Sequence, residues 1–144
     1  MTLTHQGAPW VKSVASKLRD VPYPADPAVL DPRIAKADDP QIKRALERYR
    51  EEGWDRKKVE TELAIVGEWA KQRGVFATCN EFGVYRKVAP LSARVAWTRD
   101  VRESLEKLGI GWTIWDSTFG FLSRQDGQTS VDGDIAKALG LKAP

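Results

Sequence analysis

The chain has 144 residues, 42% apolar and 30% charged, and its 23 basic and 20 acidic residues give a net charge of +3. This length is enough for one domain with a core, and the interspersed acidic residues disfavour nucleic-acid binding, which needs a basic stripe. A single cysteine excludes an internal disulfide, a single histidine disfavours a structural zinc site, and no apolar run approaches the roughly 20 residues of a membrane helix.

The first 40 residues are predicted to be irregular. Five prolines fall between positions 22 and 40, and prolines at this density exclude a continuous helix or a central strand. Only residues 12–18 could hold a short helix, and residues 2–4 could form a frayed strand. A loop of this length inside a compact domain indicates a functional loop or missing structural context.

Helical periodicity begins at residue 41, and the segment 41–74 is predicted to form two helices. Asp55 can cap the second helix, whose apolar positions include Val66 and Trp69. Trp54, Trp69 and Trp97 are spread singly along the chain and are expected to be helix core residues. The second helix is expected to end at Gly74, because glycine is favoured just beyond a helix C-terminus.

Two short apolar and β-branched segments, residues 75–80 and 110–115, are predicted strands. A helix at 90–109 separates them, so the strands should be parallel. A loop through residue 127 and a terminal helix at 132–140 complete the chain. Two or three strands cannot form a complete parallel sheet or barrel, and the sequence therefore predicts a piece of a larger α/β domain.

Residues suited to chemistry stand where the two predicted strands end. Glu81 follows the first strand and Trp115 ends the second. The C-terminal edge of parallel strands is where α/β barrels place catalysis, and an indole can stack on the apolar face of a sugar. Trp112 lies three residues before Trp115 and should point to the opposite face, into the core. Cys79 is most simply a small apolar residue. This pairing predicts a carbohydrate-active site.

Three stretches resemble the C-terminal part of a glycoside hydrolase family 5 catalytic domain. They are Thr-His-Gln-Gly-Ala-Pro-Trp at 4–10, Asn-Glu-Phe-Gly at 80–83 and Gly-Trp-Thr-Ile-Trp-Asp at 111–116. The family comprises cellulase-like retaining enzymes built on a (β/α)8 TIM barrel. The resemblance implies an α/β fold: about strands six to eight of that barrel with their helices, incomplete in this chain.

The resemblance also implies roles for individual residues. Glu81 matches the family's nucleophile, Trp115 its substrate-platform tryptophan, and His5 a histidine that helps to hold the substrate. Many members follow that histidine with an aromatic residue, whereas Gln6 stands here. Asn80 is expected to be structural. The family needs no cofactor or metal, and its members usually work outside the cell or in the periplasm; the start of this chain shows no signal peptide.

A retaining glycosidase also needs an acid/base carboxyl group about 5–5.5 Å from the nucleophile. The family carries it in an Asn-Glu-Pro element at strand four, and the only Asn-Glu pair here, at 80–81, matches the nucleophile element instead. We therefore expect part of a retaining hydrolase of β-linked glucan-type glycans that is inactive alone. The alternatives are a non-catalytic remnant or glycan-binding fragment. Expected partners are the glycan, the missing N-terminal part of the barrel, or a second copy.

Overall fold

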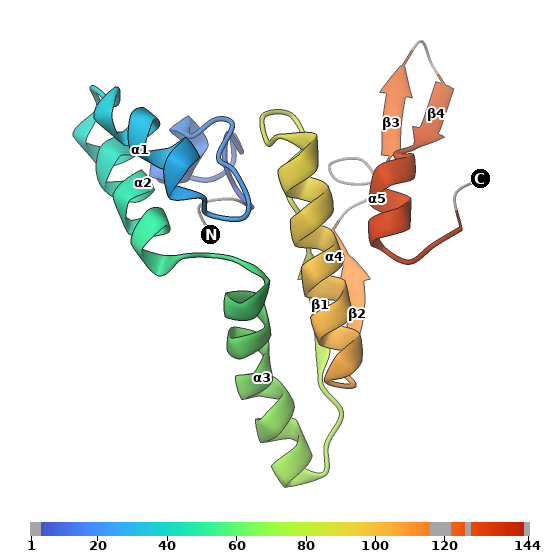
Figure 1. The fold of residues 1–144 in the computed structure, drawn as a ribbon. Helices are drawn as coiled ribbons and strands as arrows, with labels where there is room; N and C mark the ends of the chain where they lie inside the picture. Colours follow the sequence, from blue (N-terminus) through green and yellow to red (C-terminus); the bar gives the residue numbers. More distant parts are fainter. Residues whose placement is uncertain (1–3, 116–121, 126–127, 143–144) are drawn as a thin grey trace.

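The computed structural model describes residues 4–115, 122–125 and 128–142 (Figure 1). The described elements, in chain order, are η1 (Val14–Lys17), α1 (Pro27–Ala35), α2 (Pro40–Glu52), α3 (Arg56–Arg73), β1 (Thr78–Phe82), α4 (Leu91–Lys107), β2 (Gly111–Ile114), β3 (Leu122–Gln125), β4 (Gln128–Val131) and α5 (Gly133–Ala138). None of the described helices is long and apolar enough to cross a membrane.

The centre of the fold is a β1–α4–β2 unit. β1 and β2 pair in parallel, with Thr78 opposite Gly111 and Cys79 opposite Trp112, as the sequence predicts. α4 lies along these strands in Figure 1, with α3 beside it and α5 on its other side. Phe82 joins the layers, since its ring lies 6.1 Å from that of Trp97 on α4 and 5.7 Å from that of Trp112 on β2.

Aspartates begin four of the helices. Each accepts a hydrogen bond from a backbone N–H in the first turn through its side chain, which satisfies a donor that the helix itself leaves free; they are Asp26, Asp39, Asp55 and Asp132. Gly53 and Gly74 end α2 and α3 in the left-handed conformation, which a glycine adopts without strain. The predicted limits of the two central helices are therefore confirmed.

The first 40 residues are more regular than predicted, because α1 forms where the prolines were expected to prevent it. Pro27 stands at the first position of α1, where its missing N–H is not needed. Pro32 does lie inside the helix, a position that costs about 3 kcal/mol in an isolated helix. The Asp26 cap and the complete burial of Leu30 oppose that cost. η1 lies within the predicted segment 12–18.

The strand predictions need three corrections. β1 begins at Thr78 and not at residue 75, because Val75 still donates to the carbonyl of Ala70 at the end of α3, and Phe76 is 99% exposed. β3 and β4 form an antiparallel hairpin where a loop was predicted. Of the proposed strand at 2–4, residues 2 and 3 lie outside the described residues and Thr4 is in a turn.

One face of α3 is less buried than predicted. Val66 and Trp69 are 46% and 49% exposed, so their assignment to the core was wrong. α3 instead packs through Val59, Gly67 and Ala70, and Gly67 lies against Leu108 closely enough that an added Cβ would be 3.0 Å from that side chain. Trp69 is covered only in part, by the guanidinium of Arg73 at 4.8 Å from its ring.

Two buried polar pairs attach flanking segments to α4. The hydroxyl of Tyr23 donates to Asp100 at 2.9 Å, and Asp100 is only 5% exposed. Burial, together with this hydrogen bond, raises the pKa of Tyr23 well above its ordinary value. Nearer the N-terminus of α4, Arg94 pairs with Asp132 at 3.3 Å and so fixes the start of α5. These contacts hold the irregular N-terminal segment and the last helix on opposite sides of the same helix.

The Tyr23–Asp100 contact predicts a graded loss of stability. Tyr23→Phe should lower the free energy of unfolding by about 1.5–3 kcal/mol, because it removes a bond to a buried carboxylate. Tyr49 donates to the neutral carbonyl of Pro22 at 2.9 Å, so Tyr49→Phe should cost only about 0.5–1.5 kcal/mol. Urea unfolding of both variants measures the difference. Equal losses of stability would show that the charge of Asp100 does not strengthen its hydrogen bond with Tyr23.

Candidate active site

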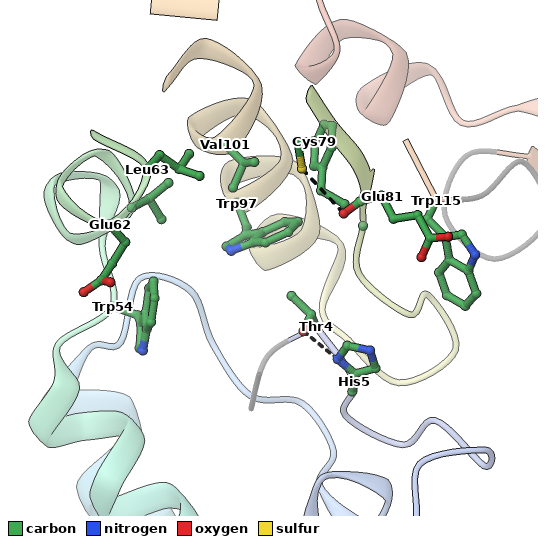
Figure 2. A pocket seen from close by; sticks show the side chains of 13 residues that line it. Thr4, His5, Trp54, Glu62, Leu63, Cys79, Glu81, Trp97, Val101 and Trp115 are labelled. Atoms are coloured by element: carbon green, nitrogen blue, oxygen red, sulfur yellow. Dashed lines mark hydrogen bonds between the residues drawn. The ribbon is translucent and has the colours of Figure 1, made fainter. Parts of the chain in front are cut away.

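A cavity of about 340 Å³ opens at the C-terminal end of β1 (Figure 2). Its walls come from the N-terminal segment, the turn before α3, α3, β1, α4 and the end of β2, and its lining residues are Thr4, His5, Trp54, Val59, Glu62, Leu63, Cys79, Glu81, Phe82, Gly83, Trp97, Val101 and Trp115. Glu81, Trp115 and His5, the three residues singled out from the sequence, all line it. The structure thus brings them to one concave surface, as expected.

Glu81 is exposed near the end of β1, whereas its neighbour Phe82 is buried in the core. The Glu81 side chain extends toward the side of the cavity where Trp115 lies (Figure 2). Cys79 precedes it by two residues on the same wall, and the Cys79 thiol lies 3.6 Å from the backbone oxygen of Glu81. Asn80 accepts a hydrogen bond from the hydroxyl of Thr78 at 2.9 Å, which fits the structural role expected for Asn80.

Gly83 controls how closely Trp115 approaches β1. The backbone N–H of Trp115 donates to the carbonyl of Phe82 at 2.8 Å, which extends the parallel pairing past the end of β2. A Cβ on Gly83 would lie 2.0 Å from the carbonyl oxygen of Trp115. Only a glycine therefore permits this approach. Trp112 packs against Phe82, in agreement with its predicted place in the core.

An aromatic neighbour of Trp115 was not singled out from the sequence. Trp10 is 43% exposed, and its ring lies 5.6 Å from that of Trp115 and 4.9 Å from that of Tyr85, both in edge-on contacts. The signal available in the sequence was its place in the stretch 4–10, which was interpreted only through His5. Edge-on aromatic contacts are favourable, so Trp10 supports the indole of Trp115 from outside the cavity.

Hydrogen bonds fix the segment that carries His5. The imidazole Nδ1 of His5 lies 2.8 Å from the hydroxyl of Thr4, and the carbonyl of Thr4 accepts from the backbone N–H of Tyr85 at 3.0 Å. Gln6 is fully buried; its amide donates to the carbonyl of Val21 at 3.3 Å and accepts from the Val21 N–H at 2.8 Å. Gln6 therefore has a structural function and does not face the cavity. Burial lowers the pKa of His5 below its ordinary value.

The opposite wall of the cavity is mainly apolar and was not anticipated. Trp54 lies between α2 and α3 and not in a helix core as its isolated position suggested, and its indole donates to Glu52 at 2.7 Å. Leu63 on α3 and Trp97 on α4 complete this wall. A second carboxylate, Glu62, also lines the cavity and pairs with Lys58 at 2.7 Å.

Within the described ranges, no three His, Cys, Asp or Glu side chains are grouped to hold a metal.

Comparison with known proteins finds cellulase-like enzymes. The chain is 27% identical over 143 residues to endoglucanase 3 of Fibrobacter succinogenes, covering 96% of this chain and 21% of that protein. Endoglucanase Cel5A of Thermotoga maritima is 26% identical with a TM-score of 0.64, over 96% of this chain and 35% of that one. A hyperthermophilic endo-β-1,4-glucanase, solved with substrate, has 25% identity, the same TM-score and coverage of 96% and 36%.

No family profile matches the chain. The fold and the comparisons nevertheless define a partial α/β structure of the kind found in cellulase-like TIM-barrel enzymes. The chain resembles the C-terminal part of a family 5 cellulase-like catalytic domain, as predicted from its motifs. It spans about a fifth of the curated relative and about a third of the solved enzymes.

The close approach at Gly83 predicts a specific structural defect. Gly83→Ala should destabilise the chain by about 1–3 kcal/mol, the usual cost of overpacking, and should displace Trp115. Gly133→Ala is the matched control, since a Cβ there meets nothing within 4 Å. Urea unfolding and quenching of tryptophan fluorescence by acrylamide measure the two effects. A Gly83→Ala variant that matched Gly133→Ala in both measurements would contradict this account.

The burial of His5 predicts its titration. His5 is the single histidine of the chain, so the imidazole proton signals of untagged protein in an NMR titration belong to it alone. The midpoint should lie below the ordinary value of 6.5 in the folded chain and return to about 6.5 in urea. Because the unfolded chain then binds the proton more readily, His5 should reduce stability as the pH falls below about 6.5. A folded midpoint at or above 6.5 would contradict the role of burial.

Proposed function

We propose that this chain is part of a family 5 retaining glycoside hydrolase that acts on β-linked glucan-type polysaccharides or oligosaccharides. Glu81 is the nucleophile, Trp115 the sugar platform and His5 a substrate contact. The observation that carries this proposal is the position of Glu81 and Trp115 at the ends of two adjacent parallel strands, on the walls of one cavity. That edge of a parallel barrel sheet is where catalytic residues gather.

The chemistry uses Glu81 in its ionised form. Its carboxylate attacks the anomeric carbon, the bond from that carbon to the leaving oxygen breaks, and a covalent glycosyl ester forms; water then hydrolyses this ester with retention. Glu81 is exposed near the end of β1, so a substrate in the cavity can reach its carboxylate. The indole of Trp115 would hold the ring of the sugar against the nucleophile by stacking on its apolar face.

The names of the relatives support a β-glucan substrate. The curated relative is an endoglucanase, and one of the solved enzymes is an endo-β-1,4-glucanase in complex with its substrate. The cavity offers three tryptophans as stacking surfaces, and these are Trp54, Trp97 and Trp115. Aromatic side chains of this kind suit the repeating apolar faces of a β-linked glucan better than a highly charged substrate.

The acid/base group is the part of the machinery that we do not assign to this chain. Glu62 is the other carboxylate lining the cavity, but it is held by Lys58 on the exposed side of α3. General acid assistance contributes typically 10²- to 10⁴-fold to such reactions. The chain alone should therefore turn over unactivated glucans poorly or not at all.

A glycan-binding function without turnover is the second candidate. The observation that favours it is the aromatic character of the cavity, which can bind sugar without a second carboxyl group. The two candidates differ in one chemical property. Only the hydrolase function requires Glu81 to form a covalent bond with the substrate.

Covalent trapping distinguishes them. A 2,4-dinitrophenyl 2-deoxy-2-fluoro-β-cellobioside has a leaving group that departs without protonation, so Glu81 can attack it without an acid partner; dinitrophenolate leaves and the glycosyl ester remains. Mass spectrometry should then show the chain gaining one fluorocellobiosyl group on the peptide that contains Glu81.

Two variants control this experiment. Glu81→Gln should abolish the adduct, whereas Glu62→Gln should keep it, because both residues line the cavity but only Glu81 stands at the strand end. An adduct that still forms in the Glu81→Gln variant would show that Glu81 is not the nucleophile. Binding of cellohexaose without any adduct on the unaltered chain would favour the glycan-binding function instead.

A further inference from the structure

A second cavity lies between the N-terminal segment and α2. Its volume is about 830 Å³, and the residues that give it its charge are Lys12, Lys17, Arg44, Arg48 and Glu52, with Ser13 beside them; we call it the basic groove. It shares no lining residue with the cavity that carries Glu81, and α2 lies apart from β1 and α4 in Figure 1. None of the described residues that line the groove is aromatic, so it lacks the stacking surfaces of the candidate active site.

Two of the four cations in the groove already have partners. Lys17 pairs with Asp39 at 3.0 Å, and this contact joins the segment that carries η1 to the start of α2. Arg48 pairs with Glu52 at 2.8 Å. The indole of Trp54 donates to the other oxygen of Glu52 at 2.7 Å, and this bond, together with the one from Arg48, lowers the pKa of Glu52. Glu52 is therefore ionised at neutral pH and holds Arg48 in place.

The other two cations are available to a ligand. Lys12 and Arg44 have no ion-pair partner within the part of the chain that the structure describes, and both are exposed. Lys12 precedes η1, whereas Arg44 lies on α2, one turn before Arg48 and therefore on the same face of that helix. Because η1 contacts α2, the two unpaired cations line one groove from two different walls.

Neutral hydrogen-bond donors lie beside these cations. The hydroxyl oxygen of Ser13 accepts from the backbone N–H of Ala15 at 3.3 Å, and no described residue accepts the hydroxyl proton of Ser13. The hydroxyl of Ser16, by contrast, donates to the carbonyl of Ser13 at 2.8 Å. The amide of Gln41 on α2 also lines the groove. An anion in the groove can therefore accept hydrogen bonds from Ser13 and Gln41 as well as from the two unpaired cations.

The charge and the size of the groove select the ligand. Its four cations are offset by two carboxylates, Glu52 and Asp39, which leaves two positive charges. A phosphate monoester carries a charge of about −1.5 to −2 at pH 7 and three acceptor oxygens, whereas one carboxylate or sulfate ester would neutralise a single charge. Sites for small organic ligands measure roughly 300–1,000 Å³, so the groove also has room for an organic part. Without aromatic walls, that part should be polar.

We propose that the basic groove binds a phosphate monoester of a small polar molecule such as a sugar. The phosphate lies between Lys12 and Arg44 and accepts a hydrogen bond from Ser13, and the polar part of the ligand contacts Gln41. This site goes beyond the proposed hydrolase function and does not depend on the role of Glu81. Because its cations are exposed, binding should be weak and should weaken further as salt screens the charges.

Titration with glucose 6-phosphate tests the proposal on the whole chain. The chain is labelled with ¹⁵N and followed by NMR in about 0.01 M salt, where screening is weak. Backbone amides in the segments 12–17 and 41–48 should shift, and their shifts give the dissociation constant. Glucose 6-sulfate has the same shape and one charge fewer, so its dissociation constant should be about fivefold higher. Inorganic phosphate should also bind more weakly, and glucose should cause no shift in these segments.

Variants of the cations locate the site. Arg44→Gln and Lys12→Gln should each raise the dissociation constant of glucose 6-phosphate about fivefold. Lys43→Gln is the matched control, because it removes the same charge from an exposed neighbour on α2 that does not line the groove, and it should leave the dissociation constant unchanged. Far-ultraviolet circular dichroism verifies that the variants keep their helices. Glu81→Gln should bind normally, so failure of the proposed catalysis and failure of this site give different results.

Four results would overturn the proposal. Equal affinities for glucose 6-phosphate and glucose 6-sulfate would show that the groove does not select a dianion. An inorganic phosphate that binds as tightly as the monoester would show that only the free ion is held. Equal losses of affinity in Arg44→Gln and Lys43→Gln would indicate attraction by net charge alone. Displacement of glucose 6-phosphate by cellohexaose would place the ligand in the cavity beside Glu81.

Discussion

The parallel pairing of β1 with β2 is the constraint on which the rest of this structure depends. It places the ends of the two strands at one edge, and the hydrogen bond from Trp115 to the Phe82 carbonyl continues the pairing beyond β2. Glu81 and Trp115 meet at the cavity because of this register. A glycine at position 83 is required for this register, since any side chain there would occupy the space of the Trp115 carbonyl. Backbone geometry, and not a contact between the two functional side chains, therefore assembles the candidate site.

The N-terminal segment is ordered by polar contacts more than by regular structure. Tyr23 reaches the buried carboxylate of Asp100, Gln6 bonds the backbone of Val21 twice, and Thr4 accepts from the chain just after β1. Buried polar groups are costly unless paired, and no buried side-chain polar atom among the described residues lacks a partner. This network explains how a proline-rich segment can hold His5 at the cavity.

The sequence was most informative where local physical rules act alone. Asp55 and Gly74 bound a helix through capping, which depends on neighbouring residues only. The places of Glu81 and Trp115 near the ends of two strands followed from the alternation of apolar runs with a helix, although β1 continues to Phe82 and β2 ends at Ile114. α1 was missed because the cap at Asp26 and the burial of Leu30 outweigh the effect of Pro32, and burial depends on distant residues.

The hairpin was missed because its strands are largely polar, although Asp126-Gly127 between them is a favourable hairpin dipeptide. The exposure of Val66 and Trp69 differs from the prediction for another reason. Their spacing predicts an apolar helix face correctly, but a periodic pattern does not state which element covers that face. The apolar wall of the cavity escaped prediction for the same reason, since Trp54, Leu63 and Val101 come together only through the packing of separate elements.

The contact made by Gln6 has a consequence for how this region can evolve. Both of its hydrogen bonds go to the backbone of residue 21, so they join the two ends of the intervening segment in the way that neighbouring strands are joined. Replacement of exposed residues between them would leave that junction unchanged, whereas Ala8 and Leu18 are buried and are not free to vary. The two ends of this segment are therefore held together next to His5, so the position of His5 at the cavity does not depend on the exposed residues of the segment.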